Sequence, residues 1–528
     1  MLIVVLLPAV VATWVLARAL YLVYFHPLAK YPGPLLAKLT DIFYAYYAWR
    51  GDIHLKIWED HQKYGDFVRY GPNLVLVCSA AGLQDIYGIG SSSCVIKSKH
   101  YVPLEHKTPS SFTSRDRKDH LRRRRIVSQT VSEKAQRGYE DRIKVHVNKL
   151  CDVLYPEPLA AGQWSASLDM GRWCNWLTFD IMSDIVFSAY YNLLGSERFR
   201  YVPEAISKSN VRMSVLVIIP WLSLFNMDRY FFRDAIIARY RFLKFVVRCV
   251  RERIQRGIKL ELSGIPHGEQ EPSPDAIEGG AGGDVFQALS SARDSKTGRS
   301  FGQEELASES ITLIVAGSET SSTAIASVLF YLADNKSAYN RLAAEVRASS
   351  EAAFQSCIYL RACIDEAMRM SPPNGAVLGR EVVAPNGLLV DGSRIGPGCN
   401  TGVGIYAIHH DGRCYADPFV YRPERWIEDD GSGDSIERAR AAFNPFSLGT
   451  RSCLGKSLAY HEIAITIGTI LRRGDFRFAP GELGRVGRGK PGARASYRGR
   501  QPENEYQLRE HIAGQKNGPW LEFLPQSR

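Results

Sequence analysis

The stretch "FSLGTRSCLG", residues 446–455, holds one cysteine between glycines and beside an arginine. A cysteine that only packs in a core needs an apolar niche and no flanking glycines. Because glycine has no side chain, Gly449 and Gly455 would let a large, flat group approach the backbone around Cys453. The following segment, "LGKSLAYHEIAITIGTIL", has apolar residues at helical spacing. The thiol is therefore expected at the start of a helix, where free N–H groups stabilise a thiolate.

A thiolate in such a loop is a strong ligand for haem iron, and the alternative is a buried, inert cysteine. Phe446 is placed to cover the sulfur, and Arg451 to reach a haem propionate. The pattern Phe446-x-x-Gly449-x-Arg451-x-Cys453-x-Gly455 resembles the haem-binding loop of the cytochrome P450 family, the haem-thiolate monooxygenases. The resemblance implies a mainly α fold with small β-sheets, and haem b with Cys453 as the axial ligand of its iron.

A second motif, "AGSETSS", lies inside the apolar run "ESITLIVAGSETSSTAIASVLFYL", which predicts a long helix. Gly317 in mid-helix costs about 1 kcal/mol relative to alanine, so it needs a reason. The resemblance implies that this helix crosses the distal face of the haem and that Ala316 and Gly317 leave room for dioxygen. It also implies that Glu319 and Thr320 relay protons, since O–O cleavage consumes two protons in a dry pocket. Taken alone, the motif also reads as a polar helix stripe with Ser318, Ser321 and Ser322.

The segment "HLRRRRIVS", residues 120–128, resembles the helix that binds the haem propionates in this family. His120 stands where a tryptophan is common, and an imidazole N–H can make a similar bond. Arg124 matches the family's arginine, and Arg380 in "VLGREVV" resembles a further propionate ligand. The remaining arginines are expected on a solvated face or near the surface where a reductase docks: Arg122, Arg123 and Arg125.

The segment "EAMR" places Glu366 and Arg369 three residues apart on one helix face. Apolar neighbours and the two prolines after the helix indicate that this pair is buried, and a buried ion pair needs a further partner. The resemblance implies that Arg425 in "YRPERW" completes a structural network behind the haem.

The N-terminus carries an apolar run over residues 2–25 with Arg18 as its only charge, and about 20 such residues span a bilayer. A cleaved signal peptide is the alternative, but the run is long and its start is not basic. Lys30 and Lys38 follow, so the positive-inside rule predicts a cytosolic body. We expect a membrane anchor over residues 1–25 and one catalytic domain over 26–528, held by a single pass in the endoplasmic reticulum membrane.

The bulk composition limits the other classes of protein. The 528 residues are 45% hydrophobic, and the 10 cysteines form no CxxC pair, which argues against a disulfide scaffold and a zinc site. The net charge of +11 suits an anionic membrane or an acidic protein partner. Nucleic acid is not expected, because the basic clusters lack interleaved aromatic residues. Small sheets are expected near the N-terminus and around residues 376–404, and a long surface loop before Val285.

These features predict an anchored monooxygenase that inserts one atom of O2 into a lipophilic small molecule. "GRGKPG", residues 487–492, contains Pro491 and opens no helix, so it is not a nucleotide site. Electrons would then come from NADPH through a separate cytochrome P450 reductase, with cytochrome b5 as a further candidate partner. The segments "FHPLAKYPGP" and "KYGDFVRYGPN" are typical of filamentous-fungal members, which suggests secondary metabolite biosynthesis.

Three alternatives stay open from the sequence. The apolar stretch 211–225 lies where the family has its substrate-access helices, but it also reads as ordinary core. A haem-thiolate isomerase or dehydratase would keep the fold without using dioxygen. A non-catalytic haem sensor or electron carrier would need neither the anchor nor a distal pocket.

Overall fold

Helices dominate the computed structural model, which describes residues 2–156, 162–224, 226–263, 283–427, 435–492 and 498–526. The predicted class, mainly α with small sheets, is confirmed. The predicted surface loop before Val285 falls largely on residues 264–282, outside the described part. The α-helices are α1 Leu2–Leu20, α2 Leu35–Leu39, α3 Ile42–Arg50, α4 Ile53–Tyr64, α5 Ala80–Tyr87, α6 Arg117–Thr130, α7 Glu133–Leu154, α8 Met170–Phe187, α9 Tyr201–Leu216, α10 Trp221–Leu224, α11 Asp228–Phe231, α12 Arg233–Ser263, α13 Val285–Ser291, α14 Gln303–Asp334, α15 Lys336–Ala348, α16 Ile358–Met370, α17 Ile405–His409, α18 Ile436–Ala442 and α19 Lys456–Arg473.

Short helical turns connect several of these elements. They are η1 Tyr21–Phe25, η2 Ile89–Ser93, η3 Lys99–Leu104, η4 Glu351–Ser356, η5 Pro423–Trp426, η6 Gly449–Arg451, η7 Gly481–Arg485 and η8 Arg498–Arg500. The strands are β1 Phe67–Gly71, β2 Leu74–Val77, β3 Val95–Lys97, β4 Leu168–Asp169, β5 Arg380–Val382, β6 Leu388–Val390, β7 Ser393–Ile395, β8 Asn400–Val403, β9 Gly474–Phe478, β10 Arg509–His511, β11 Ala513–Gln515 and β12 Trp520–Pro525.

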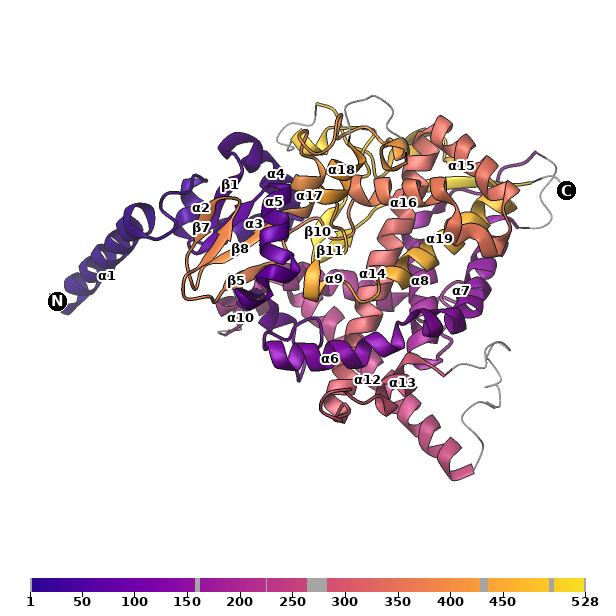
Figure 1. The fold of residues 1–528 in the computed structure, drawn as a ribbon, viewed down its shortest axis with the longest axis horizontal. Helices are drawn as coiled ribbons and strands as arrows, with labels where there is room; N and C mark the ends of the chain where they lie inside the picture. The colour runs from indigo at the N-terminus through magenta and orange to yellow at the C-terminus, as the bar shows by residue number, and fades with distance from the viewer. Residues whose placement is uncertain are drawn as a thin grey trace.

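The two regions where strands were expected join into one five-stranded sheet, in the order β1-β2-β8-β5-β3. Strands β2 and β8 pair in parallel, and the other neighbours pair antiparallel. Three smaller sheets were not all foreseen: β6 with β7, β10 with β11, and β4-β12-β9. The last two of these bring the C-terminal residues 509–525 back against the helical body (Figure 1).

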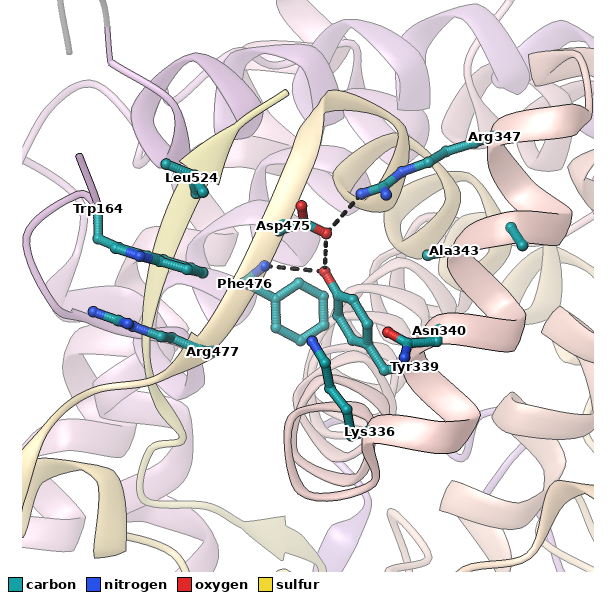
Figure 2. Close-up of a pocket in the computed structure, with 11 residues that line it drawn as sticks. Trp164, Lys336, Tyr339, Asn340, Ala343, Arg347, Asp475, Phe476, Arg477 and Leu524 are labelled. Carbon is teal, nitrogen blue, oxygen red and sulfur yellow. Dashed lines mark hydrogen bonds and ion pairs between the residues drawn. The ribbon is translucent and has the colours of Figure 1, made fainter. Parts of the chain in front are cut away.

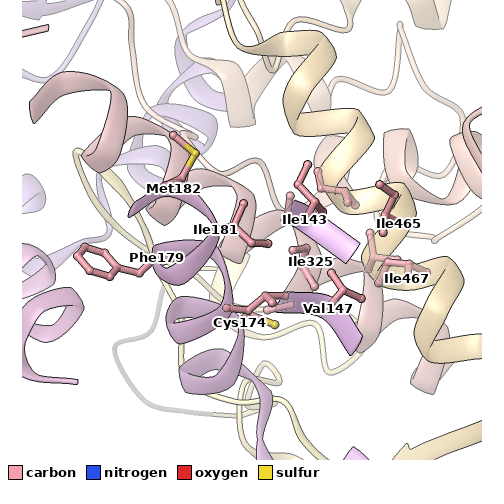
Figure 3. Close-up of a cluster of buried hydrophobic side chains, with 14 of the residues drawn as sticks. Ile143, Val147, Cys174, Phe179, Ile181, Met182, Ile325, Ile465 and Ile467 are labelled. Carbon is pink, nitrogen blue, oxygen red and sulfur yellow. The ribbon is translucent and has the colours of Figure 1, made fainter. Parts of the chain in front are cut away.

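The core surrounds α14, whose 32 residues make a rod about 48 Å long. Helix α14 packs along α8, and α7 and α19 close the same cluster (Figure 3). Residues of all four helices in this cluster are almost fully buried: Ile143, Val147, Cys174, Ile181, Ile325, Ile465 and Ile467. The apolar length of α14 would also suit a membrane span, but most of it is buried inside the protein. Its hydrophobicity therefore serves the core.

The N-terminal helix differs from α14 because its apolar side chains are exposed. The segment Leu7–Phe25 is long and apolar enough to cross a membrane, and α1 projects away from the body in Figure 1. Its end is tied to the body, since the buried Arg69 of β1 donates a hydrogen bond from Nη1 to the carbonyl oxygen of Leu22 at 2.6 Å. The anchor helix thus ends at a contact with the first sheet.

Candidate active site

Cys453 lies between the η6 turn and the first turn of α19, as the sequence predicted. Protein surrounds this thiol, yet Cys453 is exposed, so open space adjoins the residue. Burial raises the pKa of the thiol, and N–H groups of Gly455 and Lys456 donate to the sulfur and oppose that rise. The amide of Cys453 donates to the carbonyl oxygen of Phe446 at 2.9 Å, which closes the loop.

The two glycines of the loop have different surroundings. Gly449 has φ +64°, and a Cβ atom there would lie 2.2 Å from the carbonyl oxygen of Tyr87. A Cβ on Gly455 would meet the Cys453 sulfur at an ordinary distance of 3.9 Å. Gly449 therefore lets the cysteine loop press against the end of α5, a packing role that the sequence did not indicate. The ring of Phe446 packs against Tyr460, with the centroids 5.1 Å apart.

Basic side chains converge beside this loop. His120 and Arg380 are almost fully buried, and Arg451 donates to the carbonyl oxygen of Ser114 at 2.6 Å. Burial, together with Arg380 and other nearby cations, lowers the pKa of Arg451 to about 10. Burial, together with Arg451 and other nearby cations, lowers the pKa of His120 to about 3, so this imidazole is neutral. Arg124 of α6 donates to the backbone oxygen of Ser452, directly before the cysteine, at 2.7 Å.

The sequence analysis missed Lys97 in this group. Strands β3 and β5 pair so that Lys97 lies directly opposite Arg380. Burial, Arg380 and Arg451 hold the pKa of Lys97 well below its ordinary value. Lys97 Nζ donates to the carbonyl oxygen of Phe112. Because like charges opposite each other destabilise a sheet, an anion bound here would stabilise the pairing. No local motif marks Lys97, because only the sheet register brings it to Arg380.

The basic side chains line a pocket of about 260 Å³ between α5, α6, β3 and the cysteine loop. None of the described residues that line it is acidic. Buried cations without acidic partners suit an anionic ligand, and a thiol beside open space suits a metal ligand. The residues present therefore fit haem, with its propionates at the basic pocket and its iron at Cys453.

On α14, the predicted distal residues face different surroundings. Ala316 is exposed although its neighbours on α14 are buried or half-buried, so open space adjoins this position. A Cβ on Gly317 would lie 2.6 Å from Cε of Met182, so this glycine has a packing reason on the side of α8. Thr320 Oγ1 donates to the carbonyl oxygen of Ala316 at 2.7 Å.

Glu319 is buried and turned toward α9. Ser207 Oγ donates to its Oε1 at 3.0 Å, and Asn210 Nδ2 donates to Oε2 at 2.6 Å. Burial raises the pKa of Glu319 to about 7, against the lowering effect of these bonds and of Lys516. Lys516 is a second residue that the sequence analysis missed, because it lies almost 200 positions from Glu319 in a segment with no family motif. A carboxyl group with a pKa near neutral pH can both take up and release a proton.

Glu366, Arg369 and Arg425 lie together and are completely buried. Arg369 donates from Nε and Nη2 to the two oxygens of Glu366, each at 2.9 Å, and Arg425 Nε donates to Oε1 at 2.9 Å. Although burial opposes it, the two guanidinium groups hold the pKa of Glu366 below its ordinary value. Arg369 Nη1 also donates to the carbonyl oxygen of His409 at 2.8 Å, which fixes α16 to α17.

The other arginines of α6 are not a free solvated face. Arg123 pairs with Glu309 at 3.3 Å and with Glu305 at 2.7 Å, and Arg122 also bonds Glu305. Arg125 pairs with Asp294 at 2.5 Å. The expectation of a solvated face is wrong for these residues, because acidic side chains of α14 and of the segment before it fold over them.

The apolar stretch 211–225 is largely core in its described part. Met213, Val215, Leu216, Ile218, Ile219 and Leu222 are buried, and Phe225 lies outside the described residues. The end of this stretch and the segment that follows it, however, expose large apolar side chains: Trp221, Leu224, Met227, Tyr230 and Phe231. The buried residues are ordinary core, and a role of the exposed ones in substrate access stays a prediction.

A further pocket of about 490 Å³ lies at the surface between α15, β9 and β12 (Figure 2). Trp164 lies against the guanidinium of Arg477, and Asp475 accepts hydrogen bonds from Tyr339 at 2.8 Å and Arg347 at 2.7 Å. Asp475, Tyr339 and Arg347 satisfy one another, and none of the predicted site residues lines this pocket. It is separate from the basic pocket beside Cys453.

Comparison with known proteins covers nearly the whole chain. A family model described as "Cytochrome P450" matches residues 32–486. "Cytochrome P450 monooxygenase poxM" of Penicillium oxalicum is 42% identical over 513 residues, or 96% of this chain and 91% of that protein. "Cytochrome P450 monooxygenase AKT7" of Alternaria alternata is 41% identical over 530 residues, with 98% and 96% covered. "Cytochrome P450 monooxygenase atnE" of Emericella nidulans is 36% identical over 543 residues, with 98% and 97% covered.

Proposed function

Because this chain belongs to the cytochrome P450 family and is a monooxygenase, we propose that it inserts one atom of dioxygen into a lipophilic small molecule of fungal secondary metabolism. The observation that carries the proposal is Cys453 at the start of α19, whose thiol is surrounded by protein while the residue stays exposed beside the basic pocket. The family implies a haem-thiolate cofactor, and when bound the haem supplies the activation of dioxygen.

Cys453 would hold the iron, and the surrounding loop keeps its sulfur in place. The N–H groups of Gly455 and Lys456 donate to the sulfur and favour its anionic form. The propionates would be held by Lys97, Arg380 and Arg451 as cations and by the neutral His120 as an N–H donor, since none of the described residues that line this pocket is acidic. Arg124 would support the loop through its bonds to Ser452.

Glu319 and Thr320 would move protons to the reacting oxygen. Glu319 is buried with a pKa raised to about 7, which suits a group that takes a proton from water and releases it again near neutral pH. Its carboxyl group bonds Ser207 and Asn210 while Thr320 bonds Ala316, so transfer between the two needs a side-chain rotation or a bridging water. Ala316, which adjoins open space, would leave room for dioxygen.

The surface of the protein supports an anchored enzyme with a separate electron donor. The exposed helix Leu7–Phe25 would hold it in the endoplasmic reticulum membrane as a single pass, with residues 26–528 as the cytosolic catalytic domain. The exposed apolar residues of α10 and α11 suit a substrate drawn from the membrane. Electrons would come from NADPH through a cytochrome P450 reductase, with cytochrome b5 as a second candidate donor.

The test is Thr320→Ala in full-length protein reconstituted with reductase and NADPH, with substrates first found by type-I spectral shift. Loss of the hydroxyl should leave substrate binding and NADPH consumption in place. The product formed per NADPH should fall, by up to about 100-fold for lost general-acid catalysis, and the hydrogen peroxide formed should rise. Thr466→Ala is the matched control, because Thr466 Oγ1 also bonds the carbonyl oxygen four residues earlier, at 2.8 Å, but inside the core.

Two results would count against the proposal. An unchanged product yield per NADPH in Thr320→Ala would remove Thr320 from the relay. If the wild-type protein consumed neither dioxygen nor NADPH with substrate and reductase present, the isomerase or dehydratase alternative would replace the monooxygenase reaction.

A further inference from the structure

The turn that follows β11 brings a lysine to α14, next to the proposed proton relay. The β10 to β11 hairpin packs against α9 and α14 (Figure 1), and Thr323 of α14 donates to the carbonyl oxygen of Gly514 at 3.0 Å. Gln515 also bonds the backbone of Ser207 on α9. The position of Lys516 is therefore set by the two helices that hold Glu319.

Uncharged acceptors surround the ammonium group of Lys516. Its Nζ donates to Asn175 Oδ1 of α8 at 2.7 Å, to Ser322 Oγ at 2.8 Å and to Thr323 Oγ1 at 3.3 Å. Three N–H groups thus meet three oxygens, which fills the donor capacity of the amine. Ser322 and Thr323 in turn donate to the carbonyl oxygen of Glu319, each at 2.9 Å. The lysine is attached to the same turn of α14 that carries the carboxyl group.

The titratable groups near this pair lie on three elements. Strand β4 contributes Asp169, α8 contributes the thiol of Cys174, and α14 contributes Glu319 itself. Helix α9 offers Glu319 only the uncharged Ser207 and Asn210. Lys516 is thus the cation whose charge acts on the Glu319 carboxyl group. Burial lowers the pKa of Lys516 itself to about 8, so Lys516 keeps its charge near pH 7, where Glu319 titrates.

From these contacts we propose that Lys516 is a positioning residue that sets the charge state of Glu319, and thereby the upper pH limit of proton delivery during turnover. The proposal rests on the proposed function for the role of Glu319, but the electrostatic link itself does not need turnover. A positive charge close to a buried carboxyl group favours its ionised form. Without that charge, Glu319 should keep its proton to higher pH.

The first experiment measures the charge of Glu319 directly in the haem-loaded, full-length protein. Difference infrared spectra across a pH series record the carbonyl band of protonated carboxyl groups. The contribution of Glu319 is isolated as the part lost in Glu319→Gln, since Glu462, Glu505 and Glu510 also have raised pKa values and contribute bands of their own. Lys516→Met should move the pH midpoint of the Glu319 band upward by about one pH unit or more.

The second experiment measures product per NADPH as a function of pH. Because the protonated carboxyl group is the donor, yield should fall at alkaline pH as Glu319 ionises. In Lys516→Met this alkaline limb should move upward by the same interval as the infrared midpoint. Lys516→Arg retains the charge and should stay near the wild-type midpoint in both experiments.

Lys149→Met is the matched control, because Lys149 is also partly buried and bonded to uncharged oxygens, those of Tyr190 and Asn192, on another part of the protein. It should leave both midpoints unchanged. An unmoved infrared midpoint in Lys516→Met would overturn the proposal, and so would equal shifts in Lys516→Met and Lys516→Arg, which would indicate packing. If the infrared midpoint moves while no protein variant consumes NADPH, the electrostatic link holds and the proposed function fails.

Discussion

Replacing Glu366 by glutamine tests whether the buried network behind the cysteine loop holds the fold together. Glu366 accepts hydrogen bonds from Arg369 and Arg425, from Trp426 Nε1 at 3.0 Å and from the backbone N–H of Arg422 at 3.0 Å. Glutamine has the same shape but one acceptor oxygen and no charge. With its oxygen in the place of Oε1, the NH2 group would face Arg369 Nε and Trp426 Nε1, which are both donors.

The expected loss follows from the burial of every member. Glu366, Arg369 and Arg425 are all 0% exposed, so two guanidinium groups would lose, inside the core, the carboxylate that pairs with both of them. Breaking a buried pair in this way costs about 3–5 kcal/mol, a large share of the roughly 5–15 kcal/mol by which proteins are stable. Glu252→Gln is the control, because its pair with Arg248 is 42% and 57% exposed and contributes less than about 1 kcal/mol.

The assay is thermal unfolding, together with the fraction of protein that keeps the long-wavelength Soret band of the reduced carbon monoxide complex. The pKa of Glu366 is lowered on folding, so its contribution is fully present above its ordinary value of 4.5 and is lost only as the pH falls through the lowered value. The full difference should therefore be seen at pH 7. Equal unfolding temperatures for Glu366→Gln and Glu252→Gln at pH 7 would refute the reasoning.

Three further outcomes can be measured with the same protein. Cys453→Ser should abolish the long-wavelength carbon monoxide band, because a serine hydroxyl stays protonated and binds iron poorly; a variant that keeps the band would mean that another residue is the ligand. Deleting residues 1–20 should release the protein from microsomes with little loss of stability. Deleting residues 1–25 also removes the Leu22 oxygen that Arg69 binds, so the free energy of unfolding should fall by about a further 1.5–3 kcal/mol. Equal stabilities of the two deletion variants would argue that this bond is unimportant. Gly449→Ala should lower the haem content much more than Gly481→Ala. Both glycines have φ near +65°, but only at Gly449 would the new Cβ atom meet a backbone atom, at 2.2 Å. Similar haem contents in the two variants would contradict this packing role.

The sequence alone identified the features whose chemistry is local. Each of these features depends on residues only a few positions apart: the cysteine loop with its helix, the polar motif of residues 316–322 on α14, and the spacing of Glu366 and Arg369. The long apolar runs likewise predicted helices, because helical periodicity is a property of neighbouring residues. Composition and these motifs were sufficient for the fold class and the family.

Contacts between distant segments could not be foreseen in the same way. One of the two long apolar runs is buried as α14 and the other is exposed as α1, although both have the length and hydropathy of a membrane span. The arginines of α6 read as a solvated face until Glu305 and Glu309 are seen to cover them. Burial depends on what packs over a segment, which no local pattern records.

The same reason explains the cations that the sequence analysis missed. Lys97 lies in the basic pocket because of the β3 to β5 register, and Lys516 reaches α14 through the β10 to β11 hairpin. Motifs in the sequence were sufficient to select the residues that we propose carry the chemistry: Cys453, Glu319 and Thr320. The tertiary structure alone decided which charges surround those residues, because electrostatic energy depends on distance in space and on burial, not on separation along the chain.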